Sequence, residues 1–283
     1  MKILIFGANG FLGKIASKIL KKDNEILAID RIYSENQLNH LDKSKVKELI
    51  DKFNPEIILN CIALTSLDFC EDNKFKALEI NTFFPSLLAE ICKVNKTKLI
   101  LFSSDYIFSG DNSPYFENSP AHPKSFYGIT KLQMEQLTLK INPEIIIIRP
   151  SIIYGLDREK DRLFYPTLNA LKNNIKIEIK DFRPKYPVFA DEVISNAIIL
   201  AKLDKKGIFN FASEKPVTRL EMAKIIANKF KLKQDLITPA EEIIQKNKPY
   251  NVQIVNKRAP EIKFSSFEQG INTLKVLIEH ENN

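Results

Sequence analysis

The chain has 283 residues, of which 44% are hydrophobic and 27% charged, a composition that excludes a disordered or fibrous protein. Its net charge of +7 comes from lysines spread along the chain, which favours a solvated surface over a nucleic-acid-binding patch. The three cysteines lack CxxC spacing and the three histidines are scattered, so neither a disulfide framework nor a metal site is expected.

The same sequence argues against membrane insertion. No apolar run is long enough to span a bilayer, and the first strand-like pentapeptide leads at once into glycines rather than into a signal peptide. We therefore expect a cytoplasmic protein that binds neither membrane nor nucleic acid. A homodimer is compatible with the sequence, which leaves the oligomeric state open.

Short β-branched runs alternate with helical patterns over the first two thirds of the chain. Nearly continuous apolar runs predict strands covered on both faces at residues 2–6, 25–29, 56–60, 98–102 and 144–149. Apolar residues at three- and four-residue spacing predict helices at residues 11–20, 46–53, 77–91 and 127–139. This alternation predicts an α/β fold with a doubly wound parallel (Rossmann) sheet, which places ligands at the carboxyl ends of the strands.

The pattern changes after Pro150, where prolines, charges and aromatic residues become frequent. We assign residues 1–150 with 184–205 to the larger domain, and residues 151–183 with 206–283 to a smaller α/β domain that covers a substrate. Residues 191–202 predict a helix that returns to the sheet, and GIFNFAS (207–213) predicts a further strand. Thr218 and Glu221 have capping-box spacing, which marks the start of another helix.

Glycines follow the first predicted strand at three-residue intervals, at positions 7, 10 and 13 of FGANGFLG. Glycine permits a tight turn, close approach of backbone to a pyrophosphate, and close packing of helix on sheet. The amides at the start of the helix can then bind phosphate. Asp30 ends the second strand, where a carboxylate can bind the ribose hydroxyls, and this context predicts a dinucleotide.

The choice between NAD and NADP stays open at this stage. The Asp30 carboxylate favours NAD because it repels a 2′-phosphate, whereas the adjacent Arg31 can pair with that phosphate or stack on adenine. The larger domain is therefore predicted to bind NAD(P).

Tyr127 and Lys131 are four residues apart in SFYGITKLQMEQ, so they share one helix face. A neighbouring ammonium lowers the pKa of a phenol, which would let Tyr127 exchange a proton with a carbonyl oxygen. Ser104 follows the fourth predicted strand and can hydrogen-bond the same carbonyl. Asn81 either holds a water that relays protons to Lys131 or satisfies a helix kink, and both interpretations remain open.

The order GANGFLG, NCIALTSLD, SSDYIFSG and YGITK resembles the extended short-chain dehydrogenase/reductase family, and within it the dTDP-4-dehydrorhamnose reductase group. The resemblance is continuous over about residues 1–155 and weaker beyond. It implies NAD(P)H-dependent reduction of the C4 ketone of a nucleotide-linked 4-keto-6-deoxyhexose, in deoxysugar or surface polysaccharide biosynthesis. The family's sugar-pocket aromatic is absent, since Ile152 takes its place.

By this resemblance the catalytic residues are Ser104, Tyr127 and Lys131. The predicted cofactor-binding residues are Gly7, Gly10, Phe11, Leu12, Gly13, Asp30, Arg31, Cys61, Ile62, Ala63, Ser103, Tyr127, Lys131 and Pro150. The predicted substrate-binding residues are Thr65, Asp105, Tyr106, Ile152, Tyr154, Arg183 and Arg258, the two arginines because guanidinium groups suit a pyrophosphate.

Two alternatives remain. The first is a nucleotide-sugar epimerase that keeps its NAD bound. The second is a non-catalytic regulator of the kind represented by the methionine adenosyltransferase regulatory subunit. A dehydratase is disfavoured because Tyr106 follows Asp105 where that class carries a glutamate.

Overall fold

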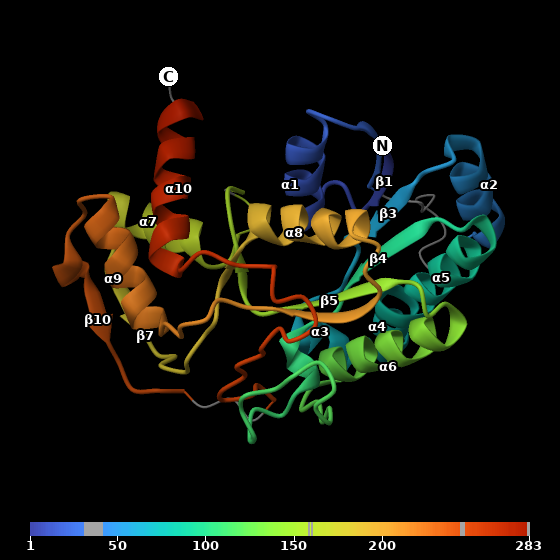
Figure 1. Ribbon diagram of the computed structural model, residues 1–283. Helices are drawn as coiled ribbons and strands as arrows, with labels where there is room; N and C mark the ends of the chain where they lie inside the picture. Colours follow the sequence, from blue (N-terminus) through green and yellow to red (C-terminus); the bar gives the residue numbers. More distant parts are fainter. Residues whose placement is uncertain (31–41, 158, 160, 244–246, 282–283) are drawn as a thin grey trace.

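The computed structural model describes residues 1–30, 42–157, 159, 161–243 and 247–281 (Figure 1). Its centre is a parallel sheet of six strands in the order β2, β1, β3, β4, β5, β9. These strands are β1 (Lys2–Phe6), β2 (Glu25–Ile29), β3 (Ile57–Asn60), β4 (Lys98–Phe102), β5 (Ile146–Pro150) and β9 (Gly207–Phe211). The predicted doubly wound α/β fold is confirmed.

Helices cover both faces of this sheet, which explains the nearly continuous apolar strands (Figure 1). In β1, Ile3 and Ile5 pack on the face covered by α1 (Phe11–Leu20) and α8 (Ala190–Lys202). Leu4 and Phe6 pack on the other face. That face is covered by α2 (Lys43–Phe53), α5 (Phe84–Asn95) and α6 (Phe126–Ile141).

The strand order creates a crevice above β1 and β3. The chain passes from β1 to β2 on one side and then to β3 on the other side of β1, which makes this a topological switch point. The glycine turn after β1 and the turn after β3 are in close contact there, because a Cβ built on Gly7 would lie 2.9 Å from the amide nitrogen of Ile62. Ligands of doubly wound sheets bind in such crevices.

Short elements link the carboxyl edge of the sheet to its surroundings. After β3 come α3 (Leu67–Asp72), α4 (Lys74–Leu78) and the single π-helical turn Glu79–Phe83, which runs directly into α5. After β4 comes the 3-10 turn Asp105–Ile107. π-helical turns inside helices frequently accompany functional sites.

A second, smaller body lies beside the sheet (Figure 1). It contains three helices and two short parallel strands around their own apolar core: α7 (Phe164–Lys172), α9 (Arg219–Lys229), α10 (Phe267–Glu281), β7 (Ile177–Ile179) and β10 (Ile237–Pro239). A 3-10 turn at Gln234–Leu236 precedes β10. The parallel pair β6 (Ile153–Tyr154) and β8 (Val188–Phe189) connects the two bodies. The predicted capping box at the start of α9 is present, with both Thr218 and Glu221 hydrogen bonds formed.

The predicted assignment of residues 206–283 to the smaller domain is wrong for two segments. Strand β9 pairs with β5 from Gly207 to Phe211 and forms an edge of the central sheet. Ala259 and Ile262 pack into the core under α1 and α8. A short apolar strand does not reveal which sheet it joins, because that choice depends on partners distant in the chain.

In the part of the chain that is described, no helix has both the length and the apolar content required to cross a membrane. Nor do the described residues include a cluster of three or more His, Cys, Asp or Glu side chains that could bind a metal ion.

Candidate functional site

The glycine turn after β1 is shaped for a phosphate ligand. Gly7 has a φ of 82°, a conformation that side chains disfavour. A Cβ on Gly13 would lie 2.0 Å from the Gly7 carbonyl oxygen, so α1 approaches the turn as closely as only glycine permits. The N-cap of α1, Gly10, makes no side-chain capping hydrogen bond within the described residues. The first amides of α1 can therefore donate to phosphate oxygens.

The remaining predicted cofactor residues lie along the same carboxyl edge. Phe11 and Leu12 begin α1, Cys61 to Ala63 follow β3, and Pro150 ends β5. Asp30 follows β2 and accepts a hydrogen bond from the Asn9 amide at 3.2 Å, which fixes its carboxylate beside the glycine turn. Arg31 lies outside the described residues.

Ser103 supplies a buried group suited to a ligand. It follows β4, and only 4% of its surface is exposed. Its hydroxyl has no hydrogen-bond partner among the described residues. A buried hydroxyl without a partner is costly, so a ligand or water that bonds to it is expected there. The glycine turn, Asp30 and Ser103 together fit a dinucleotide.

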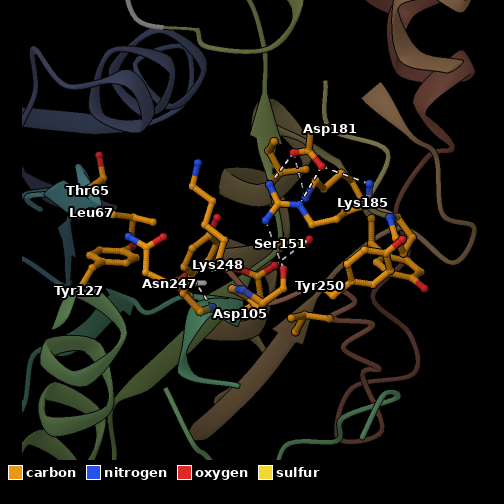
Figure 2. A pocket seen from close by; sticks show the side chains of 18 of the residues that line it. Thr65, Leu67, Asp105, Tyr127, Ser151, Asp181, Lys185, Asn247, Lys248 and Tyr250 are labelled. Atoms are coloured by element: carbon orange, nitrogen blue, oxygen red, sulfur yellow. Dashed lines mark hydrogen bonds and ion pairs between the residues drawn. The ribbon is translucent and has the colours of Figure 1, made fainter. Parts of the chain in front are cut away.

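A cavity of about 710 Å³ opens beside this edge. Among the predicted residues, the following line it: Thr65, Ser104, Asp105, Tyr106, Tyr127, Ile152 and Arg183. Figure 2 shows Thr65, Leu67 and Tyr127 on one side of the cavity, Asp181 and Lys185 on the other, and Asp105 and Ser151 between them. The volume suits a ligand of roughly 300–1,000 Å³, the usual range for small-molecule sites.

Tyr127 and Lys131 both lie inside the protein, on the first turns of α6. The Lys131 ammonium donates to the Phe102 carbonyl at 2.8 Å and lies 5.9 Å from the centre of the Tyr127 ring. The Tyr127 ring also meets the edge of Tyr106, with centroids 6.1 Å apart. The predicted helix-face pairing of Tyr127 with Lys131 is therefore present.

The predicted effect of Lys131 on Tyr127 is wrong for the protein without ligands. Burial raises the pKa of the Tyr127 phenol above its ordinary value, and a hydrogen bond with Ser104 opposes the rise only in part. Burial also lowers the pKa of Lys131 to about 8. Loss of water disfavours the charged form of both groups, and it is the largest cause of both shifts. Tyr127 consequently keeps its proton over the physiological pH range.

Ser104, Asp105 and Ser151 form one hydrogen-bonded group at the ends of β4 and β5. The Ser104 hydroxyl donates to one Asp105 oxygen at 3.2 Å, and the Ser151 hydroxyl donates to the other at 3.0 Å. Burial raises the pKa of Asp105 to about 6, against the opposing effect of these two hydrogen bonds.

Asn81 uses its side chain to hold backbone in place. Its amide nitrogen donates to the Leu64 carbonyl at 2.9 Å and to the Thr130 hydroxyl at 3.1 Å, and its oxygen accepts from the Leu64 amide at 2.9 Å. Asn81 belongs to the π-helical turn. Of the two interpretations of Asn81, these contacts favour the structural one.

Two predicted substrate residues lie elsewhere. Tyr154 is fully buried among Phe189 and Phe267, and its hydroxyl is so close to Gly270 that a Cβ there would lie 1.8 Å away. Arg258 lies at the amino end of β9, where it donates to the Lys206 carbonyl at 3.0 Å. The amino and carboxyl ends of parallel strands are opposite edges of the sheet, so Arg258 is remote from the cavity.

Arg183 lines the cavity, but its guanidinium already has a partner. It donates to both oxygens of Asp181, at 2.7 and 2.6 Å, and this pairing raises its pKa. Burial lowers the pKa of the nearby Lys185 to about 8. The positive charge of Arg183 is therefore already paired with Asp181, so it is less available to a phosphate ligand.

Three further cations of the cavity do offer such charge and were not predicted from the sequence. Arg162, Arg219 and Lys248 line the same cavity, and none of them makes a hydrogen bond or ion pair within the described residues. Arg219 is the first residue of α9, directly after the capping Thr218, and loss of water lowers its pKa. A basic residue at a helix start, where it opposes the helix dipole, was the available signal.

The chain is similar to known proteins over most of its length. A family model described as the RmlD substrate binding domain matches residues 1–278. A probable low-salt glycan biosynthesis reductase of Haloferax volcanii is 28% identical over 231 residues, which is 77% of this chain and 76% of the relative. Methionine adenosyltransferase 2 subunit beta of Rattus norvegicus is 29% identical over 269 residues, which is 89% of this chain and 80% of the relative.

Solved structures agree in fold. A hypothetical dTDP-4-dehydrorhamnose reductase from Sulfolobus tokodaii has a TM-score of 0.78 at 28% identity, with 95% of this chain and 99% of that chain covered. The dTDP-4-dehydrorhamnose reductase of Bacillus anthracis, in complex with NADP, has a TM-score of 0.87 at 22% identity, with 98% and 99% covered. Because the family model spans nearly the whole chain, the protein belongs to the RmlD substrate binding domain family, a branch of the extended short-chain dehydrogenases/reductases.

Proposed function

We propose that this protein uses NAD(P)H to reduce the C4 ketone of a nucleotide-linked 4-keto-6-deoxyhexose. One observation carries the proposal: the Tyr127 and Ser104 hydroxyls lie together in a cavity beside the carboxyl edge that bears the glycine turn. The reductases among the relatives and solved structures support the same reaction class.

The bound nicotinamide would supply the hydride, and the chain supplies the proton and the geometry. Tyr127 remains protonated because of its burial, so it can donate to the alkoxide that forms at C4, which is a far stronger base than a phenolate. Ser104 lies beside that phenol and can bind the same oxygen. Lys131 lies beneath the Tyr127 ring, anchored on Phe102, where its charge stabilises the phenolate left after the transfer.

The charged side of the cavity fits the diphosphate of a nucleotide sugar. Arg162, Arg219 and Lys248 come from three separate segments and have no described ion pairs. One guanidinium group can donate two parallel hydrogen bonds to two phosphate oxygens. This bidentate geometry favours the two arginines as ligands of the diphosphate. We propose these three residues for the role that the sequence assigned to Arg183 and Arg258.

In the decisive experiment, the protein is incubated with each of a panel of 4-keto nucleotide sugars and with NADH or NADPH. The loss of nicotinamide absorbance measures turnover. Tyr127→Phe should retain cofactor binding and lose about two to four orders of magnitude in turnover, the usual worth of a placed proton donor. Tyr106→Phe is the matched control, because Tyr106 lines the same cavity, whereas the ammonium of Lys131 lies over the ring of Tyr127. It should lose much less turnover. Equal turnover in Tyr127→Phe and wild type would contradict the proposal.

A second candidate is a regulatory subunit, favoured by the likeness to methionine adenosyltransferase 2 subunit beta over 89% of this chain. A regulator would bind NAD(P)H and consume none of it with any sugar in the panel. It would also change the activity of a methionine adenosyltransferase mixed with it, which a dedicated reductase would leave unchanged.

A further inference from the structure

Asp105 occupies a chemically unusual place in the cavity. It is the carboxylate between the two hydroxyls of Ser104 and Ser151, and its backbone follows the strand end that carries Ser104. Both of its oxygens accept a hydrogen bond from a serine. Figure 2 shows Asp105 beside Ser151, one of these two serines. Nothing in the reaction described above uses this group directly.

The direction of these hydrogen bonds limits what Ser104 can do. A serine hydroxyl has one proton, and an ionised carboxylate can only accept. While Asp105 is ionised, Ser104 gives its proton to Asp105, and its oxygen accepts from the Tyr106 amide at 3.2 Å. The remaining contact of that oxygen is with Tyr127, which must then be the donor. In this state both hydroxyl protons point away from a ketone in the cavity.

Protonation of Asp105 reverses the direction of its hydrogen bond with Ser104. A carboxylic acid can donate to the Ser104 oxygen, which frees the serine proton, while its other oxygen still accepts from Ser151. The Ser104 oxygen then no longer needs the Tyr127 proton. Both hydroxyls can then be directed at one ketone oxygen. The one bond formed is the O–H bond of the Asp105 carboxyl, with a proton taken from solvent.

We propose that Asp105 is a positioning residue that acts through Ser104: protonated, it turns the Ser104 and Tyr127 protons toward the ketone, and ionised, it turns them away. The inference rests on the proposed reduction. It predicts that the donor arrangement, and with it the rate, depends on the ionisation of a residue that does not itself exchange a proton with the substrate.

The surroundings allow this change near neutral pH. Burial raises the pKa of Asp105 to about 6, whereas Ser151, Ser104 and the charge of Lys185 oppose the rise. The other ionisable groups that face this region are Asp68 of α3, Tyr106, Tyr127 of α6, Arg162, Asp181 with Arg183, Tyr186, Arg219 of α9, Lys248 and Tyr250. The pKa values of Lys131 and Lys185 are about 8, so their titration is separate from that of Asp105.

The first test requires no activity. NMR of the ligand-free protein with ¹³C-labelled aspartate should show a carboxyl that titrates near pH 6 and whose signal is absent from Asp105→Asn. Ser151→Ala removes a hydrogen bond that lowers the pKa of Asp105, so it should move this titration to higher pH. Titration of Asp105 near the ordinary aspartate value of about 3.9 would overturn the inference.

The second test is the pH profile of the reductase. Wild-type kcat/KM should fall about tenfold per pH unit above the Asp105 transition and level off after a loss of at least about 10²-fold, because each of the two misdirected donors is worth about that much. In kcat the same fall should occur at higher pH, because a bound ligand removes more water from Asp105. Asp105→Asn has an amide that donates to Ser104 at every pH. Its kcat/KM should therefore stay constant from about pH 5 to about pH 7.5, the range in which Asp105 of the wild type loses its proton.

The matched control is Asp68→Asn, a second carboxylate of the same cavity that makes no described contact with Ser104, and it should keep the wild-type fall. A fall that persists unchanged in Asp105→Asn overturns the inference even if the protein is an active reductase. If no sugar in the panel is reduced, both the proposed function and this inference fail. If only the inference fails, the wild type still reduces a sugar and Tyr127→Phe still loses turnover.

Discussion

Lys131 places an ammonium group inside the protein, with the Phe102 carbonyl as its acceptor at 2.8 Å. Only 3% of the residue is exposed, and this burial lowers its pKa from 10.5 to about 8. An unfolded chain would hold the proton more tightly than the folded protein does. The stability of the protein therefore depends on pH through this residue.

We expect Lys131→Met to change that dependence. Below pH 8 both states of the wild type are protonated, so the cost of burying the charge is fully present. Between about pH 8 and 10.5 the folded protein releases the proton and the unfolded chain keeps it, so wild-type stability rises relative to the variant, by at most about 3 kcal/mol. Urea unfolding at several pH values measures this difference.

The control for this measurement is Lys140→Met, a change of the same kind on the exposed side of α6. It should follow the wild-type curve between pH 8 and 10.5. A Lys131→Met curve that runs parallel to wild type would show that the buried ammonium has an ordinary pKa.

At the scale of elements, α1 owes its position to the lack of a side chain at Gly13. A Cβ there would lie 2.0 Å from the Gly7 oxygen and 2.7 Å from the Gly7 carbonyl carbon, both backbone atoms that cannot move aside easily. A Cβ on Gly10 would lie 3.1 Å from the same oxygen, a tight contact that a small shift relieves. The close contact between Gly13 and the Gly7 carbonyl therefore fixes both the start of α1 and the shape of the phosphate-binding turn.

Gly13→Ala should push α1 away from the turn and destabilise the protein by about 1–3 kcal/mol, the usual cost of overpacking. It should also weaken NAD(P)H binding, because the amides at the start of α1 would move with the helix. Gly10→Ala is the matched comparison and should cost less in both respects. Denaturant unfolding and cofactor titration by fluorescence measure the two effects, and an equal response of both variants would refute the explanation.

At the scale of the molecule, a buried ion pair and the hydrogen bonds around it join distant parts of the chain. Arg149 of β5 donates to both oxygens of Glu135 on α6, at 2.9 and 2.7 Å, and to the Glu117 carbonyl at 3.0 Å. The Glu117 carboxylate accepts from the amides of Asn210 at 3.3 Å and Lys257 at 3.2 Å. The central sheet, the loop after β4 and a segment near the carboxyl terminus are therefore held together by hydrogen bonds that surround the buried Arg149–Glu135 ion pair.

Arg149→Met should destabilise the protein by about 3–5 kcal/mol, because it leaves the Glu135 carboxylate buried without a counter-charge. The double variant with Glu135→Met should recover most of this loss, since an apolar pair of similar volume carries no desolvation cost. Lys206→Met breaks an exposed pair with Glu144 that water screens, so it should destabilise the protein far less than Arg149→Met. A double variant as unstable as Arg149→Met alone would contradict this account.

Much of the fold was predictable because its signals are local. The apolar runs at residues 2–6, 25–29 and 98–102 have the observed bounds of β1, β2 and β4, and residues 11–20 form α1 as expected. Strands covered on both faces must be apolar throughout, so their pattern needs no knowledge of their partners. The same holds for the turn that requires Gly7 and for the capping box of Thr218 with Glu221.

The site was predictable only where one local motif carries the chemistry. Spacing alone puts Tyr127 and Lys131 on one helix face, and a strand end puts Ser104 at the carboxyl edge. Two other predictions failed because they depend on segments distant in the chain: Tyr154 packs against Phe267, and Arg258 lies at the opposite edge of the sheet. Arg183 pairs with its near neighbour Asp181, a contact that the sequence alone did not predict.

By itself, the sequence determined the alternation of strands and helices over the first 150 residues, the phosphate-binding turn and the Tyr127 motif, because each depends on residues within about one element of one another. Only the tertiary structure decided that β9 completes the sheet, which cations face the cavity, and that burial sets the pKa of Tyr127, Lys131 and Asp105. Loss of water is a property of the whole packed molecule, and no short stretch of sequence contains it.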